Sequence, residues 1–194
     1  MSTLVEEKAL LSKTTIGFWL YLMTDCILFA SLFATFAVLR DATAAGPAGS
    51  EIFEMPLVLA ETLILLTSSF TCGLALIALK SRNIRAIVAA LTATFVLGVA
   101  FLTIELSEFT KLVSEGHSWQ QSAFLSAFFT LVGTHGLHIF IGLIWLVTLV
   151  VVLAKRGLTV KWERQMTLFA LFWHFLDLVW IFIFTIVYLM GVMK

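Results

Sequence analysis

The sequence predicts an all-α integral membrane protein, a bundle of five transmembrane helices. Hydrophobic residues make up 61 % of the 194 residues and charged residues only 12 %, against about 25 % charged residues in soluble domains. Five apolar stretches are long enough to cross a hydrocarbon core of about 30 Å, which takes about 20 helical residues. Helices are expected rather than a β-barrel, because the strands of a barrel are short and alternate in polarity, whereas these runs are continuous.

The chain is expected to form one membrane domain, residues 1–194. Its spans are expected at about residues 15–39, 57–79, 84–106, 123–154 and 167–191. The fourth stretch is longer than one upright span, which predicts that it tilts or projects from the membrane. The connections fit this plan, because Gly46, Pro47 and Pro56 interrupt helical structure after the first span and polar, basic segments follow the second and fourth.

The distribution of basic residues predicts the topology. Nine of the twelve fall on one side of the five-span drawing: Lys8, Lys13, Lys80, Arg82, Arg85, Lys155, Arg156, Lys161 and Arg164. Only Arg40, Lys111 and Lys194 fall on the other. The positive-inside rule therefore places the N-terminus in the cytoplasm and the C-terminus outside. Four or six spans would scatter the basic loops over both faces, so the charges also support the count of five.

Titratable residues inside the spans are the candidate functional residues, because hydrocarbon tolerates them only beside a partner or a polar cavity. Six lie deep in the predicted spans: Asp25, Glu61, His135, His138, His174 and Asp177. Glu105 is expected at a span end, where water solvates it. The three-residue spacings of the two pairs in spans four and five put each pair on one helix face. We expect a buried polar cluster joining the first, fourth and fifth spans, with Asp25 facing His138, His174 or Asp177.

Four interpretations of this cluster stay open. Its members can hold helices together by hydrogen bonds worth about 0.5–2 kcal/mol each, or form a polar patch that influences proton movement in a neighbouring subunit. Histidines and carboxylates can also ligate a metal or haem, although a three-residue spacing is no ligand signature by itself. A transporter is the fourth, but the sequence lacks the paired repeats and broken helices of that class. No residue is assigned a catalytic role, and the zero net charge gives no reason to expect nucleic acid as a partner.

Glycines and aromatic residues give two further expectations. Three glycines in the fourth span allow a close helix approach there: Gly133, Gly136 and Gly142. Trp119, Trp162 and Tyr188 lie near predicted span ends, where aromatic residues commonly sit at the membrane–water interface.

Several motifs resemble subunit III of the haem–copper respiratory oxidases. Residues 133–138 read Gly-Thr-His-Gly-Leu-His, after Ser-Ala-Phe-Phe at 126–129, and residues 172–180 read Phe-Trp-His-Phe-Leu-Asp-Leu-Val-Trp. Residues 19–29, with Asp25, are similar to the family's helix that bears an intramembrane carboxylate, often Glu. Residues 105–109 resemble its short acidic segment, with Glu108 as the counterpart. The segment 46–56 is most similar to the cytochrome o ubiquinol oxidase branch.

The resemblance covers nearly the whole chain, with the five spans matching the last five of seven in many members. It implies a non-catalytic accessory subunit of a proton-pumping terminal quinol oxidase in the bacterial inner membrane. Such a chain binds no haem or copper, since both belong to subunit I, its main partner beside subunits II and IV. The family packs as a V of two arms around a phospholipid-holding cleft, here the first two and the last three spans. It supports assembly and proton uptake by subunit I.

The same analogy suggests lipid headgroup contacts for four basic residues, Arg82, Arg85, Lys155 and Arg156, beside their plainer role as solvated positive-inside charges. Two other functions stay open at this point. One is subunit III of a cytochrome c oxidase, and the other is a stand-alone electron carrier with haem b held by two histidines.

Overall fold

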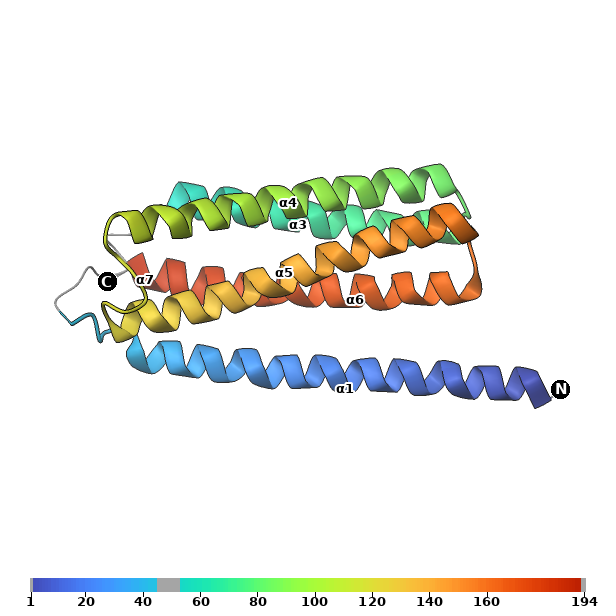
Figure 1. The fold of residues 1–194 in the computed structure, drawn as a ribbon, viewed down its shortest axis with the longest axis horizontal. Coiled ribbons are helices and arrows are strands. Elements are labelled where there is room, and N and C mark those ends of the chain that lie inside the picture. The colour runs from blue at the N-terminus through green and yellow to red at the C-terminus, as the bar shows by residue number, and fades with distance from the viewer. Residues whose placement is uncertain (1, 45–52, 193–194) are drawn as a thin grey trace.

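The computed structural model describes residues 2–44 and 53–192, with side chains described from residue 13 onward. Its elements are α1 (Ser2–Leu39), α3 (Met55–Lys80), α4 (Ile84–Ser114), α5 (Ala123–Arg156), α6 (Val160–Ile183), the π-helix η1 (Phe184–Leu189) and α7 (Met190–Val192) (Figure 1). Within these described ranges the chain is helical and has no strand. Five segments are long and apolar enough to cross a membrane: Lys13–Leu39, Met55–Lys80, Ile84–Ser114, Ala123–Arg156 and Val160–Val192. The predicted all-α, five-span protein is thereby confirmed.

Local sequence signals set where the helices begin and end. The side chains of Asn83, Ser122 and Thr159 accept hydrogen bonds from backbone amides three residues later, at the starts of α4, α5 and α6. Such caps satisfy amides that have no partner within the helix. Gly157 follows α5 with a φ of +67°, a backbone conformation that glycine adopts without strain.

Two helices extend beyond the expected spans. α4 continues to Ser114 instead of ending near residue 106, and α6 begins at Val160 instead of residue 167. Both extensions are held by tertiary contacts. Lys111 forms an ion pair with Glu54 just before α3, and the indole Nε1 of Trp162 donates to the Leu149 carbonyl at 2.8 Å. Polar composition marked these turns as loops, but packing keeps them helical.

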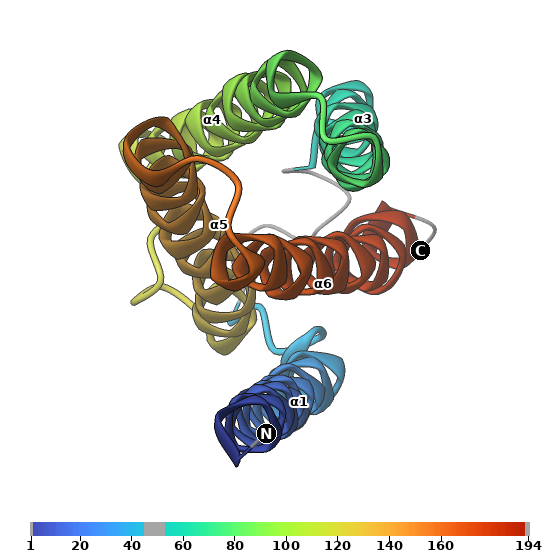
Figure 2. The same cartoon turned by 90° about the vertical axis from the view of Figure 1, so that its right-hand side faces the viewer.

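The helices α3, α4, α5 and α6 surround a common core, and α1 lies outside them against α5 and α6 (Figures 1 and 2). α3 packs mainly against α4 and also against α6. In the end-on view, α6 separates α1 from α3 (Figure 2). The expectation that the first two spans form one arm is therefore wrong, because each of them packs against later helices.

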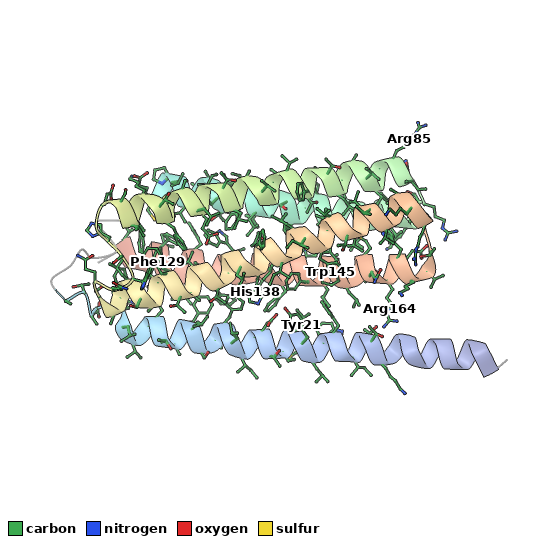
Figure 3. All side chains as sticks on the ribbon, in the orientation of Figure 1. Tyr21, Arg85, Phe129, His138, Trp145 and Arg164 are labelled. Atoms are coloured by element: carbon green, nitrogen blue, oxygen red, sulfur yellow. The ribbon has the colours of Figure 1, made fainter. Side chains whose placement is uncertain are left out.

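The basic connections lie at one end of the molecule. The links α3–α4 and α5–α6 are found at the same end as the N-terminus, with the C-terminus at the other (Figure 1). Arg85 and Arg164 both project at that end (Figure 3). The described basic residues thus gather as the five-span drawing requires, while the side chains of Lys8 and Lys194 lie outside the described residues. Which end faces the cytoplasm stays a prediction.

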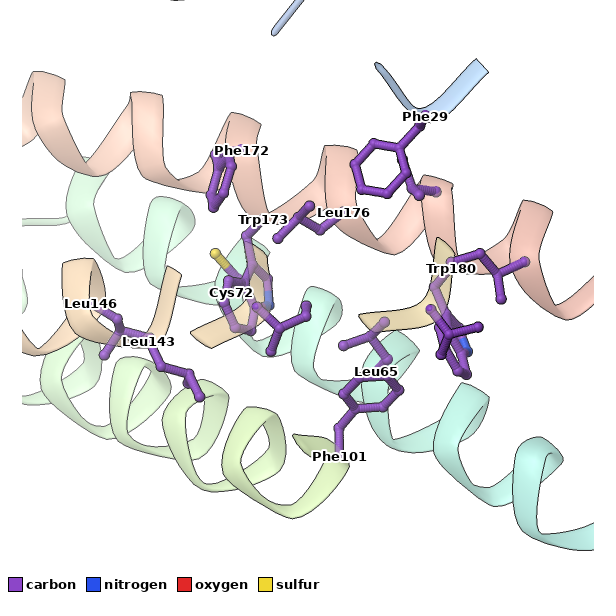
Figure 4. Close-up of a cluster of buried hydrophobic side chains, with 14 of the residues drawn as sticks. Phe29, Leu65, Cys72, Phe101, Leu143, Leu146, Phe172, Trp173, Leu176 and Trp180 are labelled. Carbon is purple, nitrogen blue, oxygen red and sulfur yellow. The ribbon is translucent and has the colours of Figure 1, made fainter. Parts of the chain in front are cut away.

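Aromatic side chains fill the core and connect α6 to α3. Trp173 and Trp180 are fully buried (Figure 4). Their indole nitrogens donate to Ser68 Oγ and Thr62 Oγ1, each at 3.1 Å. Trp162 and Tyr188 are also fully buried, so both side chains pack inside the bundle.

Two of the three glycines in α5 make the close approaches that the sequence suggested. A Cβ at Gly142 would come within 2.8 Å of Trp173 Cζ3, and one at Gly136 within 3.3 Å of Glu105 Oε1. At Gly133 the nearest atom would be 3.7 Å away, an ordinary contact distance. Glycine is therefore required by packing at position 142 and not at position 133.

Candidate functional site

The six deep titratable residues do not form the single expected cluster. Their contacts distribute them over three places: the α1–α5 contact, the α3–α6 contact and the interior between α3, α4, α5 and η1.

Asp25 faces His138, one of the partners that the sequence proposed. Asp25 Oδ1 lies 3.8 Å from His138 Nε2, and only 8 % and 12 % of the two side chains are exposed. His138 Nδ1 is 2.7 Å from the Thr134 carbonyl, which can only accept, so Nδ1 carries a proton. The ring thus directs Nε2 toward Asp25 on α1. His138 lies on the side of α5 that faces this helix (Figure 3). A proton on Nε2 would make the contact an ion pair.

Neighbouring aromatic rings shield this Asp25–His138 pair. The ring of Phe29, one turn after Asp25, lies 5.2 Å from the His138 ring. Tyr21, one turn before, is within hydrogen-bonding reach of the Asp25 carboxylate. Asp25 Oδ2 is buried and has no hydrogen-bond partner among the described residues. The pair is the main polar link between α1 and the rest of the bundle.

His174 and Asp177 lie on α6 and meet α3. His174 Nδ1 is 2.6 Å from Ser69 Oγ, and the same hydroxyl also faces the Asp177 carboxylate. Asp177 Oδ1 is buried without a hydrogen-bond partner among the described residues, whereas His174 is exposed at the surface of the chain. We call Ser69, His174 and Asp177 the α6 polar group.

Three glutamates form a third group, which the sequence identified only in part. Glu61 is 0 % exposed, Glu105 2 % and Glu108 6 %, and they interact electrostatically with one another. The Tyr188 hydroxyl donates to Glu108 Oε2 at 3.5 Å. Neither oxygen of Glu61 or Glu105 has a hydrogen-bond partner among the described residues. The expectation that water solvates Glu105 at a span end is wrong, because α4 continues to Ser114 and packs this carboxylate against Gly136.

His135 lies in the aromatic core, away from the other histidines' partners. Its ring stacks on Trp180 with centroids 5.3 Å apart and meets Phe101 edge-on at 5.9 Å. Both ring nitrogens are buried without a hydrogen-bond partner among the described residues. Although His135 and His138 share a helix face and both approach Phe29, their other neighbours differ.

Metal-ligand geometry is not found in the described part of the chain, where no group of three or more His, Cys, Asp or Glu residues could hold a metal ion. The four basic residues proposed for lipid headgroups are exposed. Arg82 is also paired with Glu163, with Nη2 and Oε1 3.0 Å apart.

A groove runs along the outer face between α4 and α5. It consists of a hollow of about 270 Å³ beside Glu105, Gly133 and Gly136 and another of about 430 Å³ that continues to Thr148. The two share Leu102 and Phe140 in their walls. Apart from Glu105 and Thr148 the lining is apolar, so the groove matches a hydrocarbon chain.

Residues that sequence reasoning missed share one signal. Ser69, Thr62 and Tyr188 are uncharged polar residues within apolar spans, and each contacts a polar side chain of a distant helix. Counting Ser, Thr and Tyr together with the charged residues would have identified them, but not their partners.

Comparison with known proteins connects this architecture to one family. The family described as cytochrome c oxidase subunit III matches residues 5–192. The chain is 55 % identical to cytochrome bo(3) ubiquinol oxidase subunit 3 of Pseudomonas aeruginosa over 92 % of its own length and 86 % of the relative's. It is 48 % identical to cytochrome c oxidase subunit 3 of Bacillus sp. strain PS3 (91 % and 85 % covered), and 46 % identical to quinol oxidase subunit 3 of Bacillus subtilis (91 % and 86 % covered). The chain therefore belongs to the cytochrome c oxidase subunit III family.

Proposed function

We propose that the chain is the accessory subunit III of a proton-pumping quinol oxidase, a complex that oxidises quinol and reduces oxygen to water. The observation that carries this proposal is the 55 % identity, over 92 % of the chain, to a protein named as subunit 3 of a cytochrome bo(3) ubiquinol oxidase. The chain acts as part of an oxidoreductase complex and does not transfer electrons itself. Haem and copper belong to subunit I, its main partner, with subunits II and IV completing the complex.

The bacterial relatives support a location in the inner membrane, with the basic end of the bundle in the cytoplasm. The task of the chain there is to support assembly and proton uptake by subunit I. The Asp25–His138 pair and the α6 polar group hold the helices in place for that task.

Lipid binding is a further part of the proposal. The α4–α5 groove is mainly apolar. At the basic end of the bundle, exposed basic residues lie on both of its helices: Arg85 on α4, and Lys155 and Arg156 on α5. A phospholipid can thus place a hydrocarbon tail in the groove and its phosphate at the basic end.

Two alternatives have less support. The relative from Bacillus sp. strain PS3 favours cytochrome c as the donor to the complex, but the relative with higher identity carries the ubiquinol name. A stand-alone haem carrier needs two imidazoles that face each other across a haem, whereas His138 faces Asp25 and His135 stacks on Trp180.

Purification of the complex through an affinity tag on this chain tests the proposal. Haem and copper should co-purify in fixed stoichiometry, and the preparation should oxidise ubiquinol with oxygen and not reduced cytochrome c. The variant Asp25→Asn should keep the haem content unchanged. A Soret band from the isolated chain, or a tagged preparation without haem and copper, contradicts the proposal.

A further inference from the structure

The α6 polar group opens outward at the middle of a membrane span. The continuous helical segment Val160–Val192 has its midpoint at residue 176, between His174 and Asp177. Leu178 and Ile181 continue the exposed face of His174 along the helix. In the end-on view α6 has α1 on one side and α3 on the other (Figure 2).

Contacts within the chain leave this group incompletely satisfied. Ser69 engages Nδ1 of His174, so the other ring nitrogen has no partner among the described residues. Asp177 Oδ1 has none either. Acyl chains offer no hydrogen bonds, and a titratable side chain at the centre of the hydrocarbon is costly unless protein covers it.

Other polar side chains on the outer faces are satisfied in a way that suits a lipid contact. Thr24, Ser31 and Thr67 each donate to a carbonyl three or four residues earlier in their own helix. This bond leaves only apolar atoms toward the lipid. The Asp25–His138 pair and the three glutamates are covered by the chain itself. His174 is exposed outward, and beside it the half-buried Asp177 carries one oxygen without a partner among the described residues.

We propose that the face of α6 formed by His174, Asp177, Leu178 and Ile181 docks a transmembrane helix of another subunit of the complex. This inference rests on the proposed function. The docked helix carries a hydrogen-bond donor at mid-depth, such as an amide, hydroxyl or cationic group, which bonds the Asp177 carboxylate and lies within reach of His174 Nε2. Apolar side chains one turn away on that helix cover Leu178 and Ile181. The acid on this face selects a donor-bearing helix over a purely apolar one.

Site-specific photo-crosslinking in the assembled complex tests the docking face. Leu178, which is 54 % exposed, is replaced by p-benzoylphenylalanine, and adducts are identified by mass spectrometry after illumination of native membranes. Val96 on α4 serves as the matched control, with 58 % exposure. Val96 lies near the same depth as Leu178, because α3 connects the two levels. Ser68 of α3 donates to the Thr94 carbonyl of α4, and the adjacent Ser69 contacts His174 of α6. No Asp, Glu or His lies within seven residues of Val96 on α4.

The expected result is a protein adduct from position 178, to a membrane helix of another subunit, and lipid adducts from position 96. Lipid adducts alone at position 178 overturn the inference, and so do equal yields of the same protein adduct at both positions. If the unmodified chain does not co-purify with haem-containing subunits, the proposed function fails first. If it does co-purify while position 178 meets only lipid, the docking inference alone fails.

A second measurement separates docking from folding. Asp177→Leu combined with His174→Phe should raise dissociation of the chain from the purified complex by about 3- to 30-fold, the range of a lost interhelical hydrogen bond. Because His174→Phe also removes the Ser69 bond between α3 and α6, the double variant is compared with Ser69→Ala, which removes that bond alone and should leave dissociation close to wild type. Asp177→Asn keeps an acceptor oxygen and should stay close to wild type. Unchanged dissociation of the double variant overturns the inference.

Discussion

Loss of Asp25 and loss of His138 should lower the free energy of unfolding by different amounts, although the two side chains form one pair. In an effective dielectric of about 20, opposite unit charges 3.8 Å apart attract each other by about 4 kcal/mol. Desolvation offsets most of that energy, and measured couplings between polar side chains in membrane proteins average about 0.6 kcal/mol with a maximum near 1.7. We therefore expect a coupling of about 1–2 kcal/mol between the two side chains.

The single variants should differ because the two residues have different second partners. After Asp25→Leu, His138 keeps its bond to the Thr134 carbonyl. After His138→Phe, Asp25 keeps only Tyr21, and its Oδ2 is already without a partner. Removing the partner of a buried carboxylate costs about 3 kcal/mol, because the remaining charge is left buried without compensation. His138→Phe leaves Asp25 in that state, so it should destabilise the chain more than Asp25→Leu. The double variant should be at least about 1 kcal/mol more stable than His138→Phe alone.

Unfolding of the purified chain in mixed micelles with increasing SDS, followed by tryptophan fluorescence, measures all four free energies. Phe is chosen at position 138 because it keeps an aromatic ring against Phe29. The reasoning is refuted if the double variant is as unstable as His138→Phe, or if Asp25→Leu is the more damaging single change.

Three further outcomes follow from the packing and the surface. Gly142→Ala should destabilise the chain by about 1–3 kcal/mol, because the added methyl group overpacks against Trp173. Gly133→Ala should be neutral or stabilise the chain by up to about 1 kcal/mol. Thermal unfolding in detergent compares the two variants, and equal effects would contradict the packing argument. Trp180→Phe should cost about 1–3 kcal/mol, because Thr62 Oγ1 loses its indole donor; the companion change Thr62→Val should add little on the Trp180→Phe background. Replacing Arg85, Lys155 and Arg156 together by Gln should lower the amount of anionic phospholipid retained by the complex, at about 1 kcal/mol of binding energy per charge. The control variant Lys13→Gln with Lys80→Gln should retain as much lipid as the parent. Mass spectrometry of the bound lipid measures both, and an equal loss would reject the α4–α5 site.

The local part of the architecture was accessible from the chain alone. Span number, helical class and the gathering of basic loops at one end follow from the length of apolar runs and the order of charges, which are properties of consecutive residues. Where packing overrode composition, the prediction failed. The polar turns of α4 after residue 106 and of α6 before residue 167 stay helical because Lys111 and Trp162 are held by distant partners.

Which polar groups meet was decided by the tertiary structure. Residue spacing showed that His135 and His138 share a helix face, but the rotation of α5 directs His138 to Asp25 and His135 into the aromatic core. The same rotation, tilt and helix order bring Glu61 and Glu108 together from two helices and leave His174 at the surface. An apolar run determines that a helix crosses the membrane, because hydrocarbon acts on each residue separately. It does not determine the helix's neighbours, because those depend on how many side chains from distant segments fit together at once.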